Sequence, residues 1–245
     1  MILTTKGLTK SFGGLKAVDQ VDIEIKKGEL RSIIGPNGAG KTTLFNLISG
    51  LHLPDSGEVL LKGENITRSN PYIRCRKGMS RSFQRSSIFP MLTTFENIQV
   101  AILSRKRKWF DLFSATKKLV KEETFDVLES VGLHEQAGAI SSTLSHGDQR
   151  LLGLGVALAT GPELLLLDEP TAGLAPRERI KMAELIGNIG KQQDMTIIFI
   201  EHDMDIVFSI SRIINVMYYG RFIAEGEPKN IRDNEEVQAI YLGGI

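Results

Sequence analysis

The chain has 245 residues, of which 42% are hydrophobic, and a formal net charge of +1 at pH 7. This length and apolar content suffice for one large domain or two modest ones. The near-zero net charge argues against a nucleic-acid-binding protein, which usually carries a strong basic excess. The one cysteine, Cys75, excludes an internal disulfide framework and fits a reducing compartment. Met1–Lys10 lacks the apolar core of a signal peptide, and no run of about 18 apolar residues occurs. We therefore expect a cytoplasmic protein, and peripheral attachment to a membrane partner remains an alternative.

The N-terminal part of the chain has the alternating pattern of half-exposed strands. Met1–Lys10 and Val18–Ile25 alternate apolar and polar residues, which predicts strands with one solvated face. Between them, Phe12 is either a core aromatic or a platform on which an adenine stacks, and burial is the commoner role of an aromatic residue. A turn at Pro54–Gly57 then leads into a third predicted strand over Glu58–Lys62.

The segment Gly35–Thr43 has the sequence G-P-N-G-A-G-K-T-T and lies between the apolar run Leu30–Ile34 and the amphipathic segment Lys41–Ser49. This is a G-x-x-x-x-G-K-[ST] phosphate loop in its expected strand–turn–helix context. Its glycines allow backbone N–H groups to form an anion nest, and the helix start adds the positive end of its dipole. Lys41 is expected to reach the β- and γ-phosphates, and the Thr42 hydroxyl to ligate Mg²⁺. The predicted nucleotide-binding residues of this loop are Gly35, Pro36, Asn37, Gly38, Ala39, Gly40, Lys41, Thr42 and Thr43.

The central part of the chain mixes short strands, helices and a basic run. Met79–Gln84 is a predicted short strand that ends in a polar amide, and Thr93 with the following glutamate resembles a capping box at the start of a helix. The cations of Arg105–Lys108, next to two aromatic residues, suggest nucleic acid or anionic lipid headgroups. A solvated loop is the favoured alternative because no other basic cluster is as dense. Ala115–Val131 is a predicted helix.

The string Leu144–Arg150 precedes a helical pattern of leucines. Ser145 and Gly147 at a helix start are ordinary capping chemistry. They are also the residue types that a second phosphate-binding helix terminus needs. On these residues alone, capping is the favoured role.

Two apolar runs end in side chains suited to phosphate chemistry. Glu163–Pro170 carries Asp168 and Glu169 at its exit, and Met195–Ile200 is followed closely by His202. Fully apolar strands belong in a parallel sheet covered on both faces, and ligands gather at the carboxyl ends of such strands. Asp168 can therefore hold Mg²⁺, Glu169 can accept a proton from the attacking water, and His202 can hydrogen-bond a γ-phosphate. The alternatives are solvated carboxylates and a structural histidine.

The remaining elements follow from periodicity and turn signals. Pro176–Lys191 is a predicted helix, with its proline in the first turn. Ile213–Tyr219 and Arg221–Ala224 are predicted closing strands, and Asn234–Leu242 is a predicted short helix.

Taken together, this order of motifs resembles the ATP-binding subunit of ABC transporters over nearly the whole chain. The phosphate loop matches the family's Walker A motif, and Leu164–Glu169 resembles Walker B with the catalytic glutamate. Gln84 falls where the Q-loop glutamine lies, and His202 where the switch histidine lies. The resemblance implies that Phe12 is the adenine-stacking aromatic.

The string Leu144–Gln149 is similar to the family's LSGGQ signature, which other NTPases with Walker motifs do not share. His146 stands for the first glycine and Asp148 for the glutamine, whereas Ser145 and Gly147 are kept. The resemblance implies that the two kept residues contact a γ-phosphate. Asp148 puts a carboxylate near that polyphosphate, so we expect weaker closure.

The resemblance implies an α/β fold: a P-loop NTPase core with a mostly parallel sheet, an N-terminal antiparallel β subdomain and an inserted α-helical subdomain. The whole chain, 1–245, is expected to be a single ABC ATPase domain. The expected parts are the nucleotide-binding core with the β subdomain (1–83 and 162–226), the helical and signature subdomain (84–161) and a C-terminal helical tail (227–245).

The implied activity is ATP hydrolysis, with Mg²⁺, in a head-to-tail dimer of two such subunits, identical or related. The implied catalytic residues are Glu169, His202, Gln84 and Lys41, and the implied Mg²⁺ ligands are Thr42, Gln84 and Asp168. ATP would lie between Lys41, Thr42 and Thr43 of one subunit and Ser145 and Gly147 of its mate. Permease subunits, contacted near Gln84 and residues 85–95, would convert closure into alternating access at the cytoplasmic face of the cell membrane.

Within the family, three stretches resemble the branched-chain amino-acid uptake group: Ala172–Pro176, Ile200–Met204 and Ile240–Gly243. A substrate-binding protein would then be an indirect partner, and nucleic acid is not expected as one. Urea or amide importers and lipopolysaccharide-export ATPases are close alternatives. Ala175 stands where many relatives carry an aspartate, which leaves open how the two sites of a dimer sense each other.

Two other classes of protein share part of this pattern. A soluble P-loop kinase would need an acceptor pocket and a lid, and it would not use Leu144–Gln149. A soluble ABC ATPase that acts on DNA or ribosomes has only Arg105–Lys108 in its favour, since this chain has one cassette and no sustained heptads.

Overall fold

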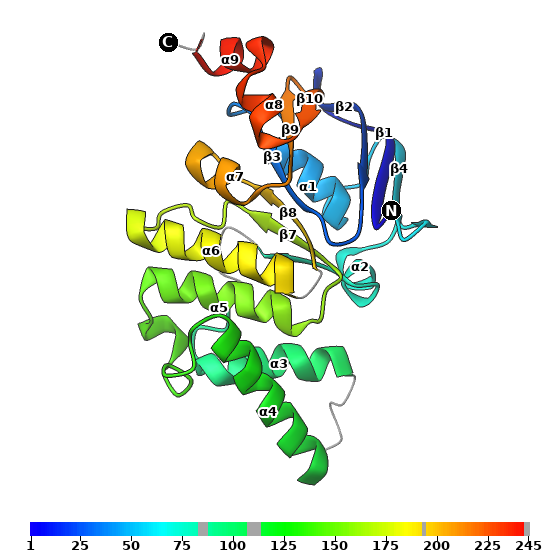
Figure 1. Ribbon diagram of the computed structural model, residues 1–245. Helices are drawn as coiled ribbons and strands as arrows, with labels where there is room; N and C mark the ends of the chain where they lie inside the picture. Colours follow the sequence, from blue (N-terminus) through cyan, green and yellow to red (C-terminus); the bar gives the residue numbers. More distant parts are fainter. Residues whose placement is uncertain (83–87, 107–113, 193–194, 243–245) are drawn as a thin grey trace.

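The computed structural model describes residues 1–82, 88–106, 114–192 and 195–242, and in these parts the chain forms two sheets with helices around them (Figure 1). The strands are β1 Leu3–Phe12, β2 Leu15–Ile25, β3 Leu30–Ile34, β4 Ser56–Leu61, β5 Glu64–Asn65, β6 Met79–Ser82, β7 Leu164–Asp168, β8 Thr196–Ile200, β9 Ile213–Tyr218 and β10 Arg221–Gly226. The helices are α1 Lys41–Ser49, α2 Pro71–Arg76, α3 Thr94–Lys106, α4 Ser114–Ser130, α5 His146–Ala159, α6 Pro176–Gln192, α7 Met204–Ile210, α8 Pro228–Arg232 and α9 Glu235–Leu242, with a 3₁₀ turn at Ser141–Thr143.

The six-stranded sheet is parallel except at one edge, in the order β10-β9-β3-β8-β7-β6, where β10 pairs antiparallel with β9. All residues of β3, β7 and β8 are buried, as expected of strands covered on both faces. Alternate leucines of β7 therefore serve two cores: Leu164 and Leu166 pack on one side of the sheet, and Leu165 and Leu167 on the other. Arg31 and Ser32 lie inside β3 but are buried and hydrogen-bonded, Arg31 to Asn215 and Ser32 to Ser211. The other polar residues of these three strands, Asp168 and Thr196, lie at strand ends.

The second sheet is antiparallel, in the order β2-β1-β4-β5, and α1 lies between it and the parallel sheet (Figure 1). Leu44, Phe45, Leu47 and Ile48 of α1 are completely buried in the core that both sheets share. The expected α/β architecture, with a mostly parallel core sheet and an N-terminal antiparallel sheet, is confirmed.

Helices α3, α4 and α5 pack against one another on the other side of the parallel sheet, and α3 and α4 lie at the end of the molecule farthest from α9 (Figure 1). The capping box at the start of α3 is present, because the Thr93 N–H donates to Glu96 Oε2 at 2.8 Å and the Glu96 N–H donates to Thr93 Oγ1 at 3.1 Å.

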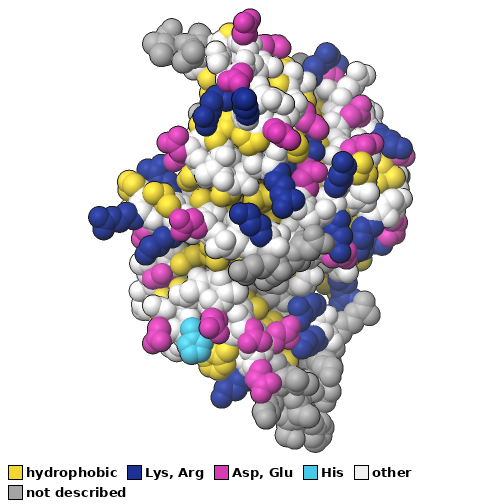
Figure 2. Space-filling model, in the orientation of Figure 1, with side chains coloured by type: hydrophobic (Ala, Val, Ile, Leu, Met, Phe, Trp, Pro, Cys, Tyr) yellow, Lys and Arg dark blue, Asp and Glu magenta, His cyan; other side chains and the backbone are white. Residues whose placement is uncertain are grey.

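Among the described residues, no helix is both long and apolar enough to cross a membrane. On the face drawn in Figure 2, acidic and basic side chains intermingle.

Some elements differ from the sequence-based expectation. The first hairpin is longer than expected, since β1 continues to Phe12 and β2 begins at Leu15, with the tight turn formed at Gly13 and Gly14. Helices α2, α7 and α8 were not predicted, because helices of five to seven residues are too short to show a period. Asn70 and Asp203 are the N-caps of α2 and α7 and accept hydrogen bonds from backbone N–H groups. These N-cap residues are the sequence feature that could have indicated where α2 and α7 start.

Arg74 of α2 is a buried cation that holds the C-terminal end of α1. Its side chain is 1% exposed, and it donates to the backbone carbonyls of Leu47, Ile48, Thr67 and Ser69 at 2.5–2.9 Å. Burial lowers the pKa of Arg74 to about 10, and the four hydrogen bonds offset the cost of burying the charge. The guanidinium also complements the negative end of the α1 dipole. Gly50 is required beside it, since its φ is +79° and a Cβ there would lie 2.6 Å from Arg74 Nε.

We expect Arg74→Met to lower the free energy of unfolding by about 3 kcal/mol, because it removes four hydrogen bonds to backbone carbonyls and leaves the buried Ile48 carbonyl without its guanidinium donor. Arg76→Met is the matched control: Arg76 is exposed on the same helix and stacks on the Tyr72 ring at 4.6 Å. That control should change the free energy by only about 0.5 kcal/mol. Denaturant unfolding measures both, and equal stabilities of the two variants would contradict the role given to Arg74.

Candidate nucleotide-binding site

The phosphate loop leaves the carboxyl end of β3 and opens α1 at Lys41, as the sequence predicts. Two of its glycines allow close approach of neighbouring strands. At Gly35, with φ of +151°, a Cβ would lie 2.1 Å from the Met217 carbonyl oxygen, and at Gly40, with φ of +105°, it would lie 2.1 Å from the Ala17 carbonyl oxygen. No larger residue fits these positions, so the loop is held between β9 and β2 by its own backbone.

Lys41 is folded back over the loop. Its side chain is buried, and Nζ donates to the carbonyl oxygens of Gly35 at 2.6 Å and Pro36 at 2.9 Å. Burial lowers the pKa of the Lys41 ammonium from its ordinary value, whereas the negative charges of Glu169 and Asp168 act in the opposite direction. The ammonium is therefore a preorganised cation directed at the region where β3 and β7 end.

The C-terminal helix also reaches this loop, which the sequence did not indicate. Tyr241 of α9 is 37% exposed, and its partial burial raises the pKa of its hydroxyl to about 12. Hydrogen bonding with the Gly35 backbone acts in the opposite direction. Helix α9 therefore lies close to the first glycine of the phosphate loop.

Asp168, the last residue of β7, has its two carboxylate oxygens in different environments. Oδ2 accepts a hydrogen bond from Arg81 at 2.6 Å, and both side chains are almost completely buried. Oδ1 is buried and has no hydrogen-bond partner among the described residues. The same guanidinium donates to Asn46 at 2.7 Å and to Ser49 at 3.0 Å in α1. Arg81 therefore ties β6, β7 and α1 together and fixes the carboxylate so that one oxygen stays available.

The role of Arg81 was missed at the sequence level. The signal was present, since a cation in a short strand of a covered sheet needs a buried acceptor. Which acceptor it finds depends on β6 lying next to β7, where Arg81 pairs with Leu166.

The oxygen donors near the loop fit a magnesium ion. An unpartnered buried carboxylate oxygen of Asp168 and the hydroxyl of Thr42, which is exposed in the first turn of α1, are hard ligands of the kind that Mg²⁺ prefers. The described residues include no group of three or more histidine, cysteine or acidic side chains that could hold a metal. An ion here would therefore take its other ligands from phosphate oxygens and water, as Mg²⁺ commonly does.

Glu169 and His202 meet across the ends of β7 and β8. His202 Nε2 lies 2.9 Å from Glu169 Oε1, and the side chains are 43% and 21% exposed, respectively. The Glu169 N–H donates to the Ile200 carbonyl at 3.0 Å, and φ of Glu169 is +49°, a left-handed conformation that is uncommon outside glycine. The sequence predicts a role at the phosphates for each residue separately, and the structure adds that the two side chains contact each other.

Ser145 is the N-cap of α5, so the capping role expected from the local residues is present. Its Oγ accepts the Asp148 N–H at 3.1 Å and donates to Asp148 Oδ2 at 2.8 Å. Gly147 lies next to Glu178 of α6, because a Cβ on Gly147 would be 3.0 Å from Glu178 Oε1. The described part of the chain shows no hydrogen bond from Ser145 or Gly147 to the phosphate loop. Two carboxylates therefore flank this helix terminus.

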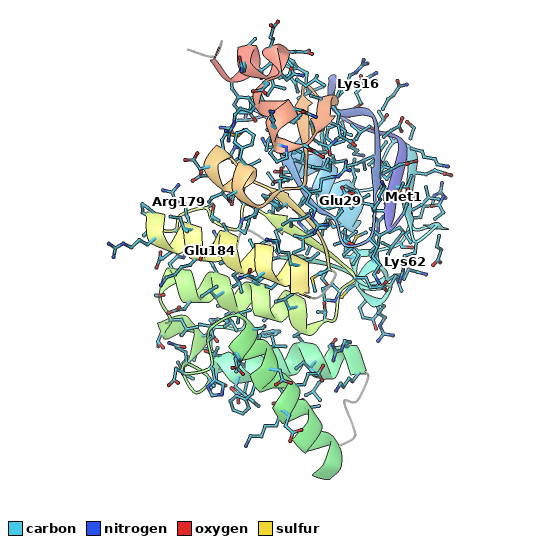
Figure 3. The ribbon with its side chains drawn as sticks, viewed as in Figure 1. Met1, Lys16, Glu29, Lys62, Arg179 and Glu184 are labelled. Carbon is cyan, nitrogen blue, oxygen red and sulfur yellow. The ribbon has the colours of Figure 1, made fainter. Side chains whose placement is uncertain are left out.

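The exit of β8 is fixed to α6. Asp203 caps α7 and accepts a hydrogen bond from Arg179 at 2.9 Å, and Figure 3 labels Arg179 on α6. The segment that carries His202 is thus held between β8 and two helices.

Phe12 is not a core residue, contrary to the expectation from aromatic residues in general. It is 48% exposed at the tip of the first hairpin, with its ring centroid 5.9 Å from that of His52 and 5.7 Å from the Lys10 ammonium. This exposure fits the alternative, a stacking platform. Gln84 lies outside the described residues.

The basic run is only partly described. Arg105 and Lys106 both pair with Glu123 of α4. These two cations therefore share one carboxylate within the chain, which supports the structural alternative for them. Residues 107–110 lie outside the described parts.

Comparisons with known proteins identify the family. The ABC transporter family matches residues 18–172, which contain the phosphate loop, the Leu144–Gln149 string and Glu169. The high-affinity branched-chain amino acid transport ATP-binding protein LivG of Escherichia coli K12 is 39% identical over 251 residues, covering 99% of this chain and 98% of the relative. BraF of Pseudomonas aeruginosa, with the same description, is 39% identical over 249 residues with the same coverage.

Solved structures agree with the sequence comparison. A nucleotide-free ATP-binding cassette from an ABC transporter is similar with a TM-score of 0.85 and 32% identity, over 98% of both chains. A dimeric cassette bound to ADP and phosphate is similar with a TM-score of 0.78 and 27% identity, over 92% of this chain and 98% of that one. The chain therefore belongs to the ABC transporter family, as an ATP-binding subunit that hydrolyses ATP.

Proposed function

We propose that two cassettes close head to tail on MgATP, each phosphate loop against the α5 terminus of its mate, and that this closure powers uptake of branched-chain or related amino acids. One observation supports the dimer most directly. Lys41, Asp168 and Glu169 converge at one sheet edge, whereas within the described residues Ser145 and Gly147 make no hydrogen bond to the phosphate loop of their own chain. In the proposed dimer, the second chain would supply them. The similar cassette that was solved as a dimer with ADP and phosphate supports this arrangement.

The proposed roles follow from the contacts. Lys41 and the loop N–H groups bind the phosphates, and Phe12 stacks on the adenine. Thr42, Asp168 Oδ1 and Gln84 hold Mg²⁺, which neutralises charge on the phosphate oxygens when it is bound. Glu169 takes a proton from the attacking water, and His202 orients that carboxylate and hydrogen-bonds the γ-phosphate.

Closure between two cassettes would place preorganised donors around the γ-phosphoryl group. Ser145 and Gly147 at the start of α5 add the positive end of a helix dipole to the cations of the other subunit. ATP bridges the subunits, so it favours the closed dimer by its higher affinity for that state. Hydrolysis removes the bridge and reopens the pair.

A permease subunit is the proposed membrane partner. A cavity of about 340 Å³ lies between α2, β6 and α5, and its lining includes Leu51, Tyr72 and Val156. Phe89 and Met91, beyond the Gln84 segment, are 55% and 80% exposed. Phe89 lines a neighbouring cavity that also includes Tyr72 and Val156. Exposed apolar side chains of this kind suit a short helix of a membrane protein, which would hold the cassette at the cytoplasmic face of the membrane.

The proposed division of the chain assigns 1–83 and 162–226 to the core, 84–161 to the helical subdomain and 227–245 to the tail. Mutual packing of α3, α4 and α5 supports the second unit. Such a unit would carry the α5 terminus relative to the core when the dimer closes.

We expect Glu169→Gln to slow ATP hydrolysis by about 10²- to 10⁴-fold, the usual contribution of a general base, while ATP affinity is retained. Phosphate release measures the first quantity and calorimetry the second. Turnover close to that of the wild type would remove Glu169 from this role.

We expect Asp148→Gln to strengthen the ATP-dependent dimer by about tenfold, because it removes a carboxylate that engages Ser145 and faces the polyphosphate. The dimer is best measured by analytical ultracentrifugation in a Glu169→Gln background. Asp126→Asn on α4, which removes an equal charge from an exposed position, should leave dimerisation unchanged. A dimer no stronger than that of this control would show that Asp148 does not limit closure.

We expect a tagged copy of the chain to co-purify with an integral-membrane protein from detergent-solubilised membranes of its own cells. Cells without the chain should lose energised uptake of labelled leucine, isoleucine and valine. Wild-type chain should restore this uptake, and Glu169→Gln should not. Unchanged uptake of all three would redirect the proposal to another transported solute, and recovery with ribosomes or DNA would contradict the transport role.

A further inference from the structure

Glu201, the residue after β8, is a buried carboxylate that accepts three hydrogen bonds. It is 4% exposed, and Oε1 accepts the Thr171 N–H at 2.9 Å and the Thr171 hydroxyl at 2.6 Å. Oε2 accepts the His202 N–H at 3.1 Å. Among the described residues, no lysine or arginine forms an ion pair with it. An acidic side chain without a cation is expensive to bury, so these three donors must offset the cost.

The three donors belong to the two backbone segments that carry the Glu169–His202 contact. Thr171 follows Glu169 by two residues in the loop after β7, and it is 2% exposed. His202 follows Glu201 directly. One carboxylate therefore links the two segments: Oε1 binds the Thr171 segment and Oε2 binds the His202 segment.

This arrangement requires acceptors at both ends of the side chain. A glutamine of the same shape has one acceptor oxygen and one NH₂ group, which cannot accept an N–H bond. With its oxygen toward Thr171, the NH₂ group would face the His202 N–H. The left-handed backbone of Glu169 also needs neighbours that hold it, because such conformations persist only where the surroundings impose them.

We propose that Glu201 is a positioning residue for hydrolysis, which sets the distance and orientation of Glu169 relative to His202 by clamping both backbone segments. It touches neither the phosphate loop nor the reacting atoms in the described structure, so it acts through the Glu169–His202 contact. The inference rests on the proposed catalytic roles of those two residues. It assigns to Glu201 a contribution to turnover and none to nucleotide affinity.

The first test compares Glu201→Gln with the wild-type chain in steady-state ATP hydrolysis, together with nucleotide binding by calorimetry. We expect kcat to fall about tenfold, since loss of alignment by a fraction of an ångström weakens a positioned base, and KM to stay within about twofold. Glu29→Gln is the control: Glu29, labelled in Figure 3, is a largely buried carboxylate that precedes β3, at the end of the strand away from the phosphate loop. Its kcat should match that of the wild type.

The second test asks whether Glu201 acts through His202. In a His202→Ala background the alignment no longer matters, so adding Glu201→Gln should lower the residual rate no further. A merely structural role predicts the same additional loss in both backgrounds, and that result would overturn the proposal. A loss of nucleotide affinity equal to the loss of rate would overturn it as well.

A third pair of variants covers the case in which Glu201→Gln does not fold. Thr171→Ser keeps both donors to Glu201 and should retain kcat, whereas the isosteric Thr171→Val removes the hydroxyl and should lower kcat at unchanged KM. Equal rates of these two variants would refute the clamp. If Glu169→Gln and His202→Ala both hydrolyse ATP at the wild-type rate, the proposed function fails instead, which separates the two ideas.

Discussion

The site depends on the parallel alignment of three buried strands that end at the same level. Ile33 of β3 pairs with Ile200 of β8, and Ile200 pairs with Asp168 of β7. These strands are mostly apolar and both their faces are covered, so the polar side chains that can reach a ligand are those where the strands end. The phosphate loop, the carboxylates after β7 and the segment of His202 therefore meet at one edge, although they are far apart in the sequence.

Local chemistry made much of this predictable. The glycine spacing of the phosphate loop and the apolar runs gave β3, α1, β7 and β8 within a residue or two, because each is decided by residues that are neighbours in the sequence. The side-chain contacts of the site were not predictable in the same way. The bond from Arg81 to Asp168 needs β6 beside β7, and the bonds of Glu201 to Thr171 need the loops after β7 and β8 to converge. A periodic pattern carries no such information.

The start of α5 shows why two interpretations of the same residues can both be justified. The Ser145 hydroxyl caps the helix by accepting the Asp148 N–H, and it donates to the Asp148 carboxylate. Recognition of a γ-phosphate would use the same hydroxyl and the same helix dipole. The acidic residue stabilises the isolated helix and competes with an incoming polyphosphate. Capping and binding are therefore opposed uses of one set of atoms, which local sequence cannot rank.

Three carboxylates at this edge differ in what their surroundings leave free. Asp168 has one oxygen held by Arg81, and the other has no hydrogen-bond partner in the described parts of the chain, which suits a metal ligand. Glu169 is partly exposed and paired with His202, which suits a general base that must contact the attacking water and be held in a fixed orientation. Glu201 is buried, and each of its oxygens accepts hydrogen bonds from backbone or hydroxyl donors of Thr171 and His202, which suits a residue that holds two segments together. Residue type alone makes these three acids equivalent. The donors around each one distinguish the proposed metal ligand and the proposed base from the proposed clamp.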